Sequence, residues 1–225
     1  MTPSILFQYR SLSGEAFKFT QDIFLRERLF MAPAEALNDL GEGLCALDLP
    51  SHMQKSNRTQ GEIWAQGTYA WGMQIRQKES RTKTRIASFS SSFTNQLLWT
   101  HYANSHRGLC IGFLTAASPE LSRAKQVTYS DSLPIWRGDD KDVISKVYNT
   151  KSKDWSYEKE WRVISEGAAY FPLPKAAIHT VILGARISDA DKCWVEDWIR
   201  LKGWMPTLQR AVFADDRYEM RVHTV

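Results

Sequence analysis

Apolar and polar residues alternate along several short segments of the chain, and this period of two predicts β-strands. Short apolar runs that end at glycine, proline or a charged residue predict further strands. The segments expected to be extended are 5–10, 29–32, 84–92, 108–113, 126–130, 159–165, 180–185, 208–214 and 217–225. The last two flank Asp215 and Asp216, so they are expected to pair as a C-terminal hairpin.

Apolar residues that recur at three- and four-residue spacing predict helices between these strands. The segments expected to be helical are 14–28, 62–77, 96–103, 119–124, 141–149 and a C-terminal helix opened by Ser188, with Asp191 in capping-box spacing. Within 62–77, Trp64, Trp71 and Ile75 share one helical face. An aromatic stripe of this kind is expected to pack in the core.

Strands outnumber helices, and they do not alternate with helices in a regular βαβ order. This favours an α+β fold with mainly antiparallel sheets forming a cleft, flanked by several helices. A chain of 225 residues with 43% apolar residues can bury a full core. Residues 1–225 are therefore expected to form a single α+β domain.

Composition and charge narrow the functional classes. No apolar run approaches the length of a membrane span, so a soluble, cytoplasmic protein without a membrane partner is expected. Three cysteines without a CxxC pair fit a reducing compartment, and Cys110 is expected to be a small core residue. The net charge is +4, and the basic cluster 76–85 is expected to be a solvated helix end, with phosphate binding as the alternative.

A pair of carboxylates is the main candidate for chemistry. Glu158 and Glu160 stand two apart at the start of the predicted strand 159–165. An extended backbone would place both on one face with Arg162, opposite the core-facing Trp161. Like charges this close raise each other's pKa unless cations or hydrogen-bond donors compensate. The pair is either a solvated strand edge or part of a site.

Cleavage of the nicotinamide bond of NAD would give this carboxylate pair a function. The reaction develops an oxocarbenium-like centre, which a carboxylate stabilises. The phosphates of NAD need a cation, and arginine offers a planar fork of donors. Serine hydroxyls on a neighbouring strand would orient the ribose or hold the carboxylate. The chain offers Arg10 at the end of its first strand and Ser88 and Ser90 on one face of 84–92.

These three elements, in this order, resemble the arginine, Ser-x-Ser and Glu-x-Glu pattern of one class of ADP-ribosyltransferases, with Phe89 where a central threonine is often found. The resemblance implies NAD as substrate, Glu160 as the NAD-binding catalytic glutamate and Glu158 as the residue that prepares the acceptor. It also implies that Arg10 holds phosphate. The acceptor would be a protein or nucleic acid, and the chain a bacterial toxin or defence effector with a possible restraining partner.

A second resemblance covers more of the chain. The segments "FQYRSL", "PAEALND", "IASFS", "LLWTHYANSHRGLCIGF" and "DWSYEKEWRVI" resemble the bacterial domain of unknown function 2971 family. The run W-x-H-Y-A followed by H-x-G-x-C-I-G-F is the most specific part. This resemblance implies one compact domain and brings no settled activity.

Three aromatic or imidazole side chains complete the candidate site. Tyr9, next to Arg10, is included among the residues expected to bind NAD. His101 or Tyr102 is expected to border the nicotinamide or adenine pocket, with core packing as the alternative for Tyr102. His101 and His106 are five apart, a spacing that does not predict a zinc site.

Two other functional hypotheses stay open. The chain could be a non-catalytic binding module, in which case the arginine, serine and glutamate elements would lie on separate surfaces. It could also bind nucleic acid through its basic cluster. The transferase hypothesis requires the three elements to meet in one cleft.

Overall fold

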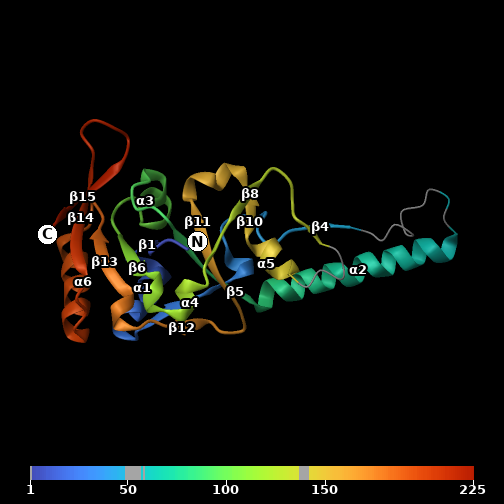
Figure 1. Ribbon diagram of the computed structural model, residues 1–225, viewed down its shortest axis with the longest axis horizontal. Helices are drawn as coiled ribbons and strands as arrows, with labels where there is room; N and C mark the ends of the chain where they lie inside the picture. The colour runs from blue at the N-terminus through green and yellow to red at the C-terminus, as the bar shows by residue number, and fades with distance from the viewer. Residues whose placement is uncertain (1, 49–56, 58, 137–141) are drawn as a thin grey trace.

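A long sheet runs through the molecule and organises the other elements (Figure 1). The computed structural model describes residues 2–48, 57, 59–136 and 142–225. In spatial order the strands are β15 (Met220–Thr224), β14 (Thr207–Phe213), β13 (Ile178–Leu183), β6 (Leu109–Leu114), β1 (Ile5–Arg10), β5 (Thr84–Ser90), β11 (Glu160–Glu166) and β7 (Lys125–Gln126), and β3 (Ala32–Pro33) also pairs with β5. Neighbouring strands are antiparallel except β13 and β14. The predicted α+β class with mainly antiparallel strands is confirmed.

Short strand pairs and helices surround this sheet. The pairs are β8 (Thr128–Ser130) with β10 (Thr150–Ser152), β2 (Arg28–Phe30) with β12 (Tyr170–Pro172), and β4 (Ala46–Leu47) with β9 (Ile135–Trp136). The helices are α1 (Gly14–Leu25), α2 (Gln60–Lys83), α3 (Gln96–Tyr102), α4 (Pro119–Ser122), α5 (Val143–Tyr148), α6 (Asp189–Lys202) and the 3₁₀-helices η1 (Ala34–Ala36), η3 (Thr115–Ala117), η4 (Lys153–Glu158) and η5 (Lys175–Ala177). Within the part of the chain that is described, no helix is both long and apolar enough to span a bilayer.

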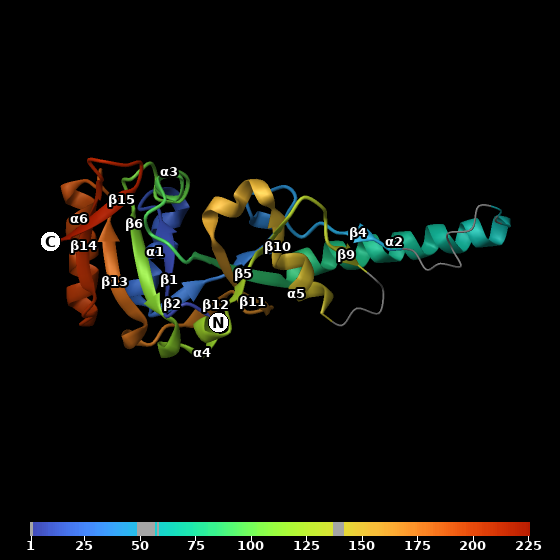
Figure 2. The same cartoon turned by 45° about the horizontal axis from the view of Figure 1, so that its top comes forward.

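The two faces of the sheet carry different cores because side chains alternate along each strand. Leu6, Phe24 of α1 and Trp198 of α6 belong to the larger core on one face. Tyr9 and Cys110 belong to a smaller core on the other face, which α3 covers. Cys110 is fully buried, as predicted for a small core residue. Figure 2 shows α3 and α6 beside the end of the sheet that contains β6, β13 and β14.

The sheet splits between β1 and β5. These strands share one register pair, Phe7 with Ser90, among the residues that the structure describes. Next to this pair, the side-chain amide of Gln8 donates to the carbonyl of Ser88 at 3.1 Å. Further along, β5 pairs with β3 instead, with Ala32 opposite Ile86. The two strands therefore diverge and leave room between them.

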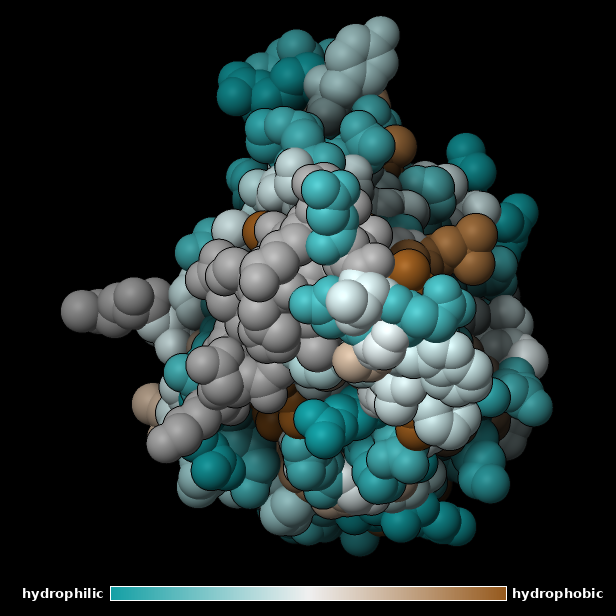
Figure 3. Space-filling model, turned by 90° about the vertical axis from the view of Figure 1, so that its right-hand side faces the viewer, coloured by the Kyte–Doolittle hydropathy of each residue, from teal (hydrophilic) through white to brown (hydrophobic). Residues whose placement is uncertain are grey.

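Helix α2 differs most from its prediction. It begins after a capping box formed by Thr59 and Glu62 and continues to Lys83, so it extends beyond the predicted 62–77. Its aromatic stripe was expected in the core, but Trp64 is 72% exposed and Trp71 is 65% exposed. The helix projects away from the sheet (Figure 1), and these two indole rings lie outside the core. Seen from the end where α2 projects, the surface is largely hydrophilic, with isolated hydrophobic residues (Figure 3).

Most other predicted elements appear with small shifts in their ends. The predicted strand 5–10 coincides with β1, and the C-terminal hairpin is confirmed as β14 paired with β15. The predicted strand 126–130 divides into β7 and β8, and the extended segment 29–32 divides between β2 and β3. The predicted helix 141–149 is α5, with residue 141 outside the described residues.

Candidate functional site

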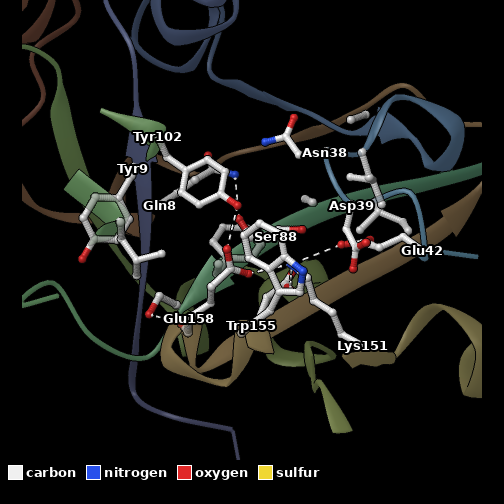
Figure 4. Close-up of a pocket in the computed structure, with 18 of the residues that line it drawn as sticks. Gln8, Tyr9, Asn38, Asp39, Glu42, Ser88, Tyr102, Lys151, Trp155 and Glu158 are labelled. Atoms are coloured by element: carbon white, nitrogen blue, oxygen red, sulfur yellow. Dashed lines mark hydrogen bonds and ion pairs between the residues drawn. The ribbon is translucent and has the colours of Figure 1, made fainter. Parts of the chain in front are cut away.

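A cavity of about 230 Å³ opens where β1 and β5 diverge (Figure 4). Strands β1 and β5, helix α3, the 3₁₀-helix η4 and the segment after β3 form its walls. The polar side chains that line it are Gln8, Tyr9, Arg10, Asn38, Asp39, Glu42, Ser88, Ser90, Tyr102, Lys151, Glu158 and Glu160. Residues far apart in the sequence therefore meet in one place.

Seven of the eight predicted site residues lie in this cavity wall, namely Tyr9, Arg10, Ser88, Ser90, Tyr102, Glu158 and Glu160. The eighth, His101, lies on the exposed side of α3 and is not part of the cavity lining. The arginine, serine and glutamate elements thus converge. They do not lie on separate surfaces, which is the arrangement expected for a non-catalytic binding module.

The two glutamates are presented by a turn, which corrects the extended geometry expected for them. Glu158 is the last residue of η4, and Glu160 begins β11. Lys159 between them is in the left-handed region, with φ 47° and ψ 48°. Glu158 and Glu160 are each only 4% exposed. The interpretation of the pair as a solvated strand edge is therefore wrong.

Lys151 neutralises part of this buried charge. Its Nζ lies 2.6 Å from Oε2 of Glu158, 3.2 Å from Oε1 of Glu42 and 3.3 Å from Oε2 of Glu160. The same ammonium group is 4.7 Å from the ring centroid of Trp155. A lysine with three carboxylates around it is stabilised in its charged form despite burial.

Arg162 supplies the second cation. Its Nε and Nη2 donate to the two oxygens of Glu160 at 2.7 and 2.9 Å, the bidentate geometry that suits a guanidinium. Nη2 also lies 2.9 Å from Oε2 of Glu42, and Nη1 donates to the carbonyl of Tyr148 at 2.8 Å. We call Glu42, Lys151, Glu158, Glu160 and Arg162 the ion cluster.

The charged states of the ion cluster follow from these contacts. Burial acts to raise the pKa of Glu160, but the Arg162 guanidinium, Lys151 and the Ser88 hydroxyl hold the pKa below its usual range. Burial acts to lower the pKa of Lys151 and of Arg162, yet the carboxylates beside them raise both pKa values. Three carboxylates face two cations, so by formal charge the cluster has an excess of negative charge.

Two tyrosines form hydrogen bonds with Glu158 and Glu160. The hydroxyl of Tyr102 donates to Oε1 of Glu158 at 2.6 Å, and the backbone amide of Glu160 donates to the hydroxyl of Tyr129 at 2.8 Å. Burial and the hydrogen bond to Glu158 both raise the pKa of Tyr102, so it stays a donor at neutral pH. Tyr102 therefore borders the cavity and also packs against the smaller core.

The two serines lie on β5, where Ser90 is the register partner of Glu160 and Ser88 that of Arg162 in β11. The hydroxyl of Ser90 donates to the carbonyl of Glu158 at 2.7 Å. The hydroxyl of Ser88 helps to lower the pKa of Glu160. Ser90 therefore holds the backbone of Glu158 and not its carboxylate.

Arg10 differs from the other cations of the site because it lacks a carboxylate partner among the described residues. Its Nε donates to Oγ1 of Thr20 at 3.3 Å. Burial lowers the pKa of Arg10 to about 10, which still leaves it charged at neutral pH. A charged fork of donors at a cavity wall, without an internal anion, is suited to bind an anionic group.

A glycine fixes the backbone that carries Arg10. A Cβ on Gly108 would lie 2.1 Å from the carbonyl oxygen of Arg10, so only glycine allows this approach. Gly108 precedes β6, whose Leu109 is the register partner of Arg10. The motif H-x-G-x-C-I-G-F thus has a structural reason, which is the close packing of β6 against the end of β1.

Sequence reasoning missed Glu42, Lys151 and Trp155. Glu42 lies in the loop after η1 and Lys151 in the short strand β10, and neither position carries a local pattern. Lys151 stands seven residues before Glu158, a spacing that matches no motif. Within the described residues, no group of His, Cys, Asp and Glu side chains is arranged to hold a metal ion.

Comparison with protein families gives one match. Residues 98–163 match the family model described as Protein of unknown function (DUF2971). The matched segment contains Tyr102, Lys151, Glu158 and Glu160, and it supports the resemblance to that family. No curated protein matches the chain. No solved structure matches it either.

Proposed function

We propose that the chain is an NAD-consuming enzyme of the ADP-ribosyltransferase type. The observation that carries the proposal is the convergence of Arg10, the two serines and the two glutamates on one cavity at a split in the sheet. Each of these short patterns is common alone, but one ligand accounts for all of them together. The split sheet supplies a gap in which an extended dinucleotide can lie.

The charge of the site suits the reaction. In the proposed step the bond between the anomeric ribose carbon and the nicotinamide nitrogen breaks, and its electron pair leaves with nicotinamide. The ribose carbon becomes cationic, and a buried carboxylate stabilises that charge. An acceptor nucleophile, or water, then bonds to this carbon and loses its proton. Before the step the positive charge lies on the pyridinium ring of NAD, and as neutral nicotinamide leaves, this charge moves to the ribose carbon. A carboxylate of the ion cluster beside that carbon therefore favours the intermediate.

Arg10 suits the phosphates. Arg10 has donors without a carboxylate partner among the described residues, and a pyrophosphate would supply that partner. The volume of about 230 Å³ is below the roughly 300–1,000 Å³ of sites that enclose a whole small ligand. We therefore expect the reacting half of NAD to enter the cavity and the other half to lie across its mouth.

Binding of NAD by Arg10→Gln tests this assignment. A hydrogen bond to a charged group contributes about 1.5–3 kcal/mol, so we expect the affinity for NAD to fall about 10- to 100-fold. Isothermal titration calorimetry with NAD measures the change. Arg107→Gln is the matched control because Arg107 is exposed and outside the cavity wall. Equal affinity in Arg10→Gln and wild type would reject Arg10 as the phosphate ligand.

A further inference from the structure

The two glutamates differ in how many hydrogen bonds the protein already donates to them. An ionised carboxylate has about four lone-pair positions for acceptance. Glu160 receives Nε and Nη2 of Arg162 at 2.7 and 2.9 Å and Nζ of Lys151 at 3.3 Å. Protein donors therefore occupy three of its acceptor positions.

Glu158 is left with acceptor capacity. Its Oε1 receives the hydroxyl of Tyr102 and its Oε2 receives Nζ of Lys151, both at 2.6 Å. These are its two side-chain donors among the described residues. About two lone-pair positions remain on a carboxylate that lines the cavity. In Figure 4 the Glu158 side chain lies between Tyr102 and Lys151, within the group of residues that face one another.

The cation partners of the two glutamates also differ. Glu160 has two cation partners, because it binds the Arg162 guanidinium in bidentate geometry and also contacts Lys151. Lys151 is the single cation that pairs with Glu158 among the described residues, and it is shared with Glu42 and Glu160. The excess negative charge of the ion cluster is thus least compensated at Glu158.

We infer that Glu158 is the carboxylate that contacts the substrate and stabilises the ribosyl cation, and that Glu160 is a positioning residue. This inference rests on the proposed function and reverses the roles that the ADP-ribosyltransferase resemblance implies. Glu160 acts through Arg162 and Lys151. It holds the guanidinium against β11 and the ammonium group at the distance from which it fixes Oε2 of Glu158.

Tyr102 is a positioning residue in the same arrangement. Its hydroxyl fixes Oε1 of Glu158 and comes from α3, which is a different element from the one that carries Lys151. Two donors from two elements hold the carboxylate plane in one orientation. The remaining acceptor positions of Glu158 then have a fixed orientation, and because Glu158 lines the cavity, we expect a ribose hydroxyl to donate to one of them.

The test compares Glu158→Gln and Glu160→Gln in one assay. For each variant we measure nicotinamide release under single-turnover conditions, the Kd for NAD and the thermal midpoint. Glu158→Gln is expected to keep a midpoint within a few degrees of wild type and a Kd within a few fold, while release falls about 100-fold or more. Glu160→Gln is expected to lose mainly thermal stability, with a smaller loss of release.

Tyr102→Phe provides a second test that does not depend on the folding of Glu160→Gln. It removes the donor to Oε1 of Glu158 and leaves the contacts of Glu160 in place, so release is expected to fall about 10-fold with an unchanged midpoint. Wild-type release in folded Glu158→Gln overturns the inference, and so does a complete loss of release in folded Glu160→Gln. Absence of NAD binding and release in the wild-type protein rejects the proposed function instead.

Discussion

At the scale of single residues, Lys159 shows how local strain shapes the site. Its left-handed backbone costs about 1–2 kcal/mol for a residue with a Cβ. Because of this turn, Glu158 can end a 3₁₀-helix and Glu160 can begin a strand while both residues line the same cavity. The strain is therefore located where it aims two carboxylates.

Substitution of Lys159 measures this strain. Glycine adopts the left-handed region without penalty, so Lys159→Gly is expected to keep the free energy of unfolding or raise it by up to about 1 kcal/mol. Lys159→Val places a β-branched residue there and is expected to lower it by about 1–3 kcal/mol. Urea denaturation of both variants gives the values. Equal stability of the two would contradict the left-handed turn.

Glu160 makes the stability of the protein depend on pH. Its folded-state pKa is lower than that of an unperturbed glutamate, about 4.3. The stability it contributes is therefore fully present above that pH and is lost as pH falls through the folded-state pKa. Glu160→Gln removes the bidentate partner of Arg162 and leaves it Glu42 alone, and it is expected to cost about 3–5 kcal/mol at pH 7.

Urea denaturation of wild type and Glu160→Gln from pH 7 to pH 3 tests this linkage. The difference between their free energies of unfolding should be constant above about pH 5 and shrink below about pH 4. A difference that stays constant down to pH 3 would show that Glu160 is not held ionised by the ion cluster.

At the scale of elements, α2 and α3 use tryptophan in opposite ways. Trp99 of α3 is fully buried, and its indole donates to the carbonyl of Phe93 at 2.7 Å. Trp71 of α2 is 65% exposed on a helix that projects from the body. The sequence alone does not separate these cases, because both residues lie on helical faces with apolar neighbours.

Alanine substitutions should therefore have unequal effects. Trp99→Ala removes a large buried side chain and is expected to cost about 3–5 kcal/mol. Trp71→Ala is expected to change the free energy of unfolding by less than about 0.5 kcal/mol. Thermal and urea denaturation compare the two. A large loss in Trp71→Ala would mean that the outward face of α2 is covered in solution.

The elements that follow from local pattern are the ones that the sequence predicts well. Alternation in 5–10 gives β1, and Ser188 with Asp191 gives the start of α6. The presentation of Glu158 is missed because a 3₁₀-helix and a left-handed residue replace the expected extended backbone. A period of two carries no information about such a turn.

At the scale of the whole molecule, the site is a consequence of the split sheet. The one register pair between β1 and β5, Phe7 with Ser90, holds the strands together at one end, and the cavity forms beyond it. Motif order predicts that Arg10, Ser88 and Glu160 belong together. It does not predict the ion cluster, because Glu42 and Lys151 reach the site only through the long-range packing of separate elements.

Nicotinamide release from NAD by the purified wild-type protein, measured beside folded Glu158→Gln, tests the central claim most directly. We expect wild type to bind NAD and release nicotinamide, and Glu158→Gln to bind NAD but release nicotinamide about 100-fold more slowly. Wild-type protein that neither binds NAD nor releases nicotinamide would contradict the claim that this cavity is an NAD-cleaving site.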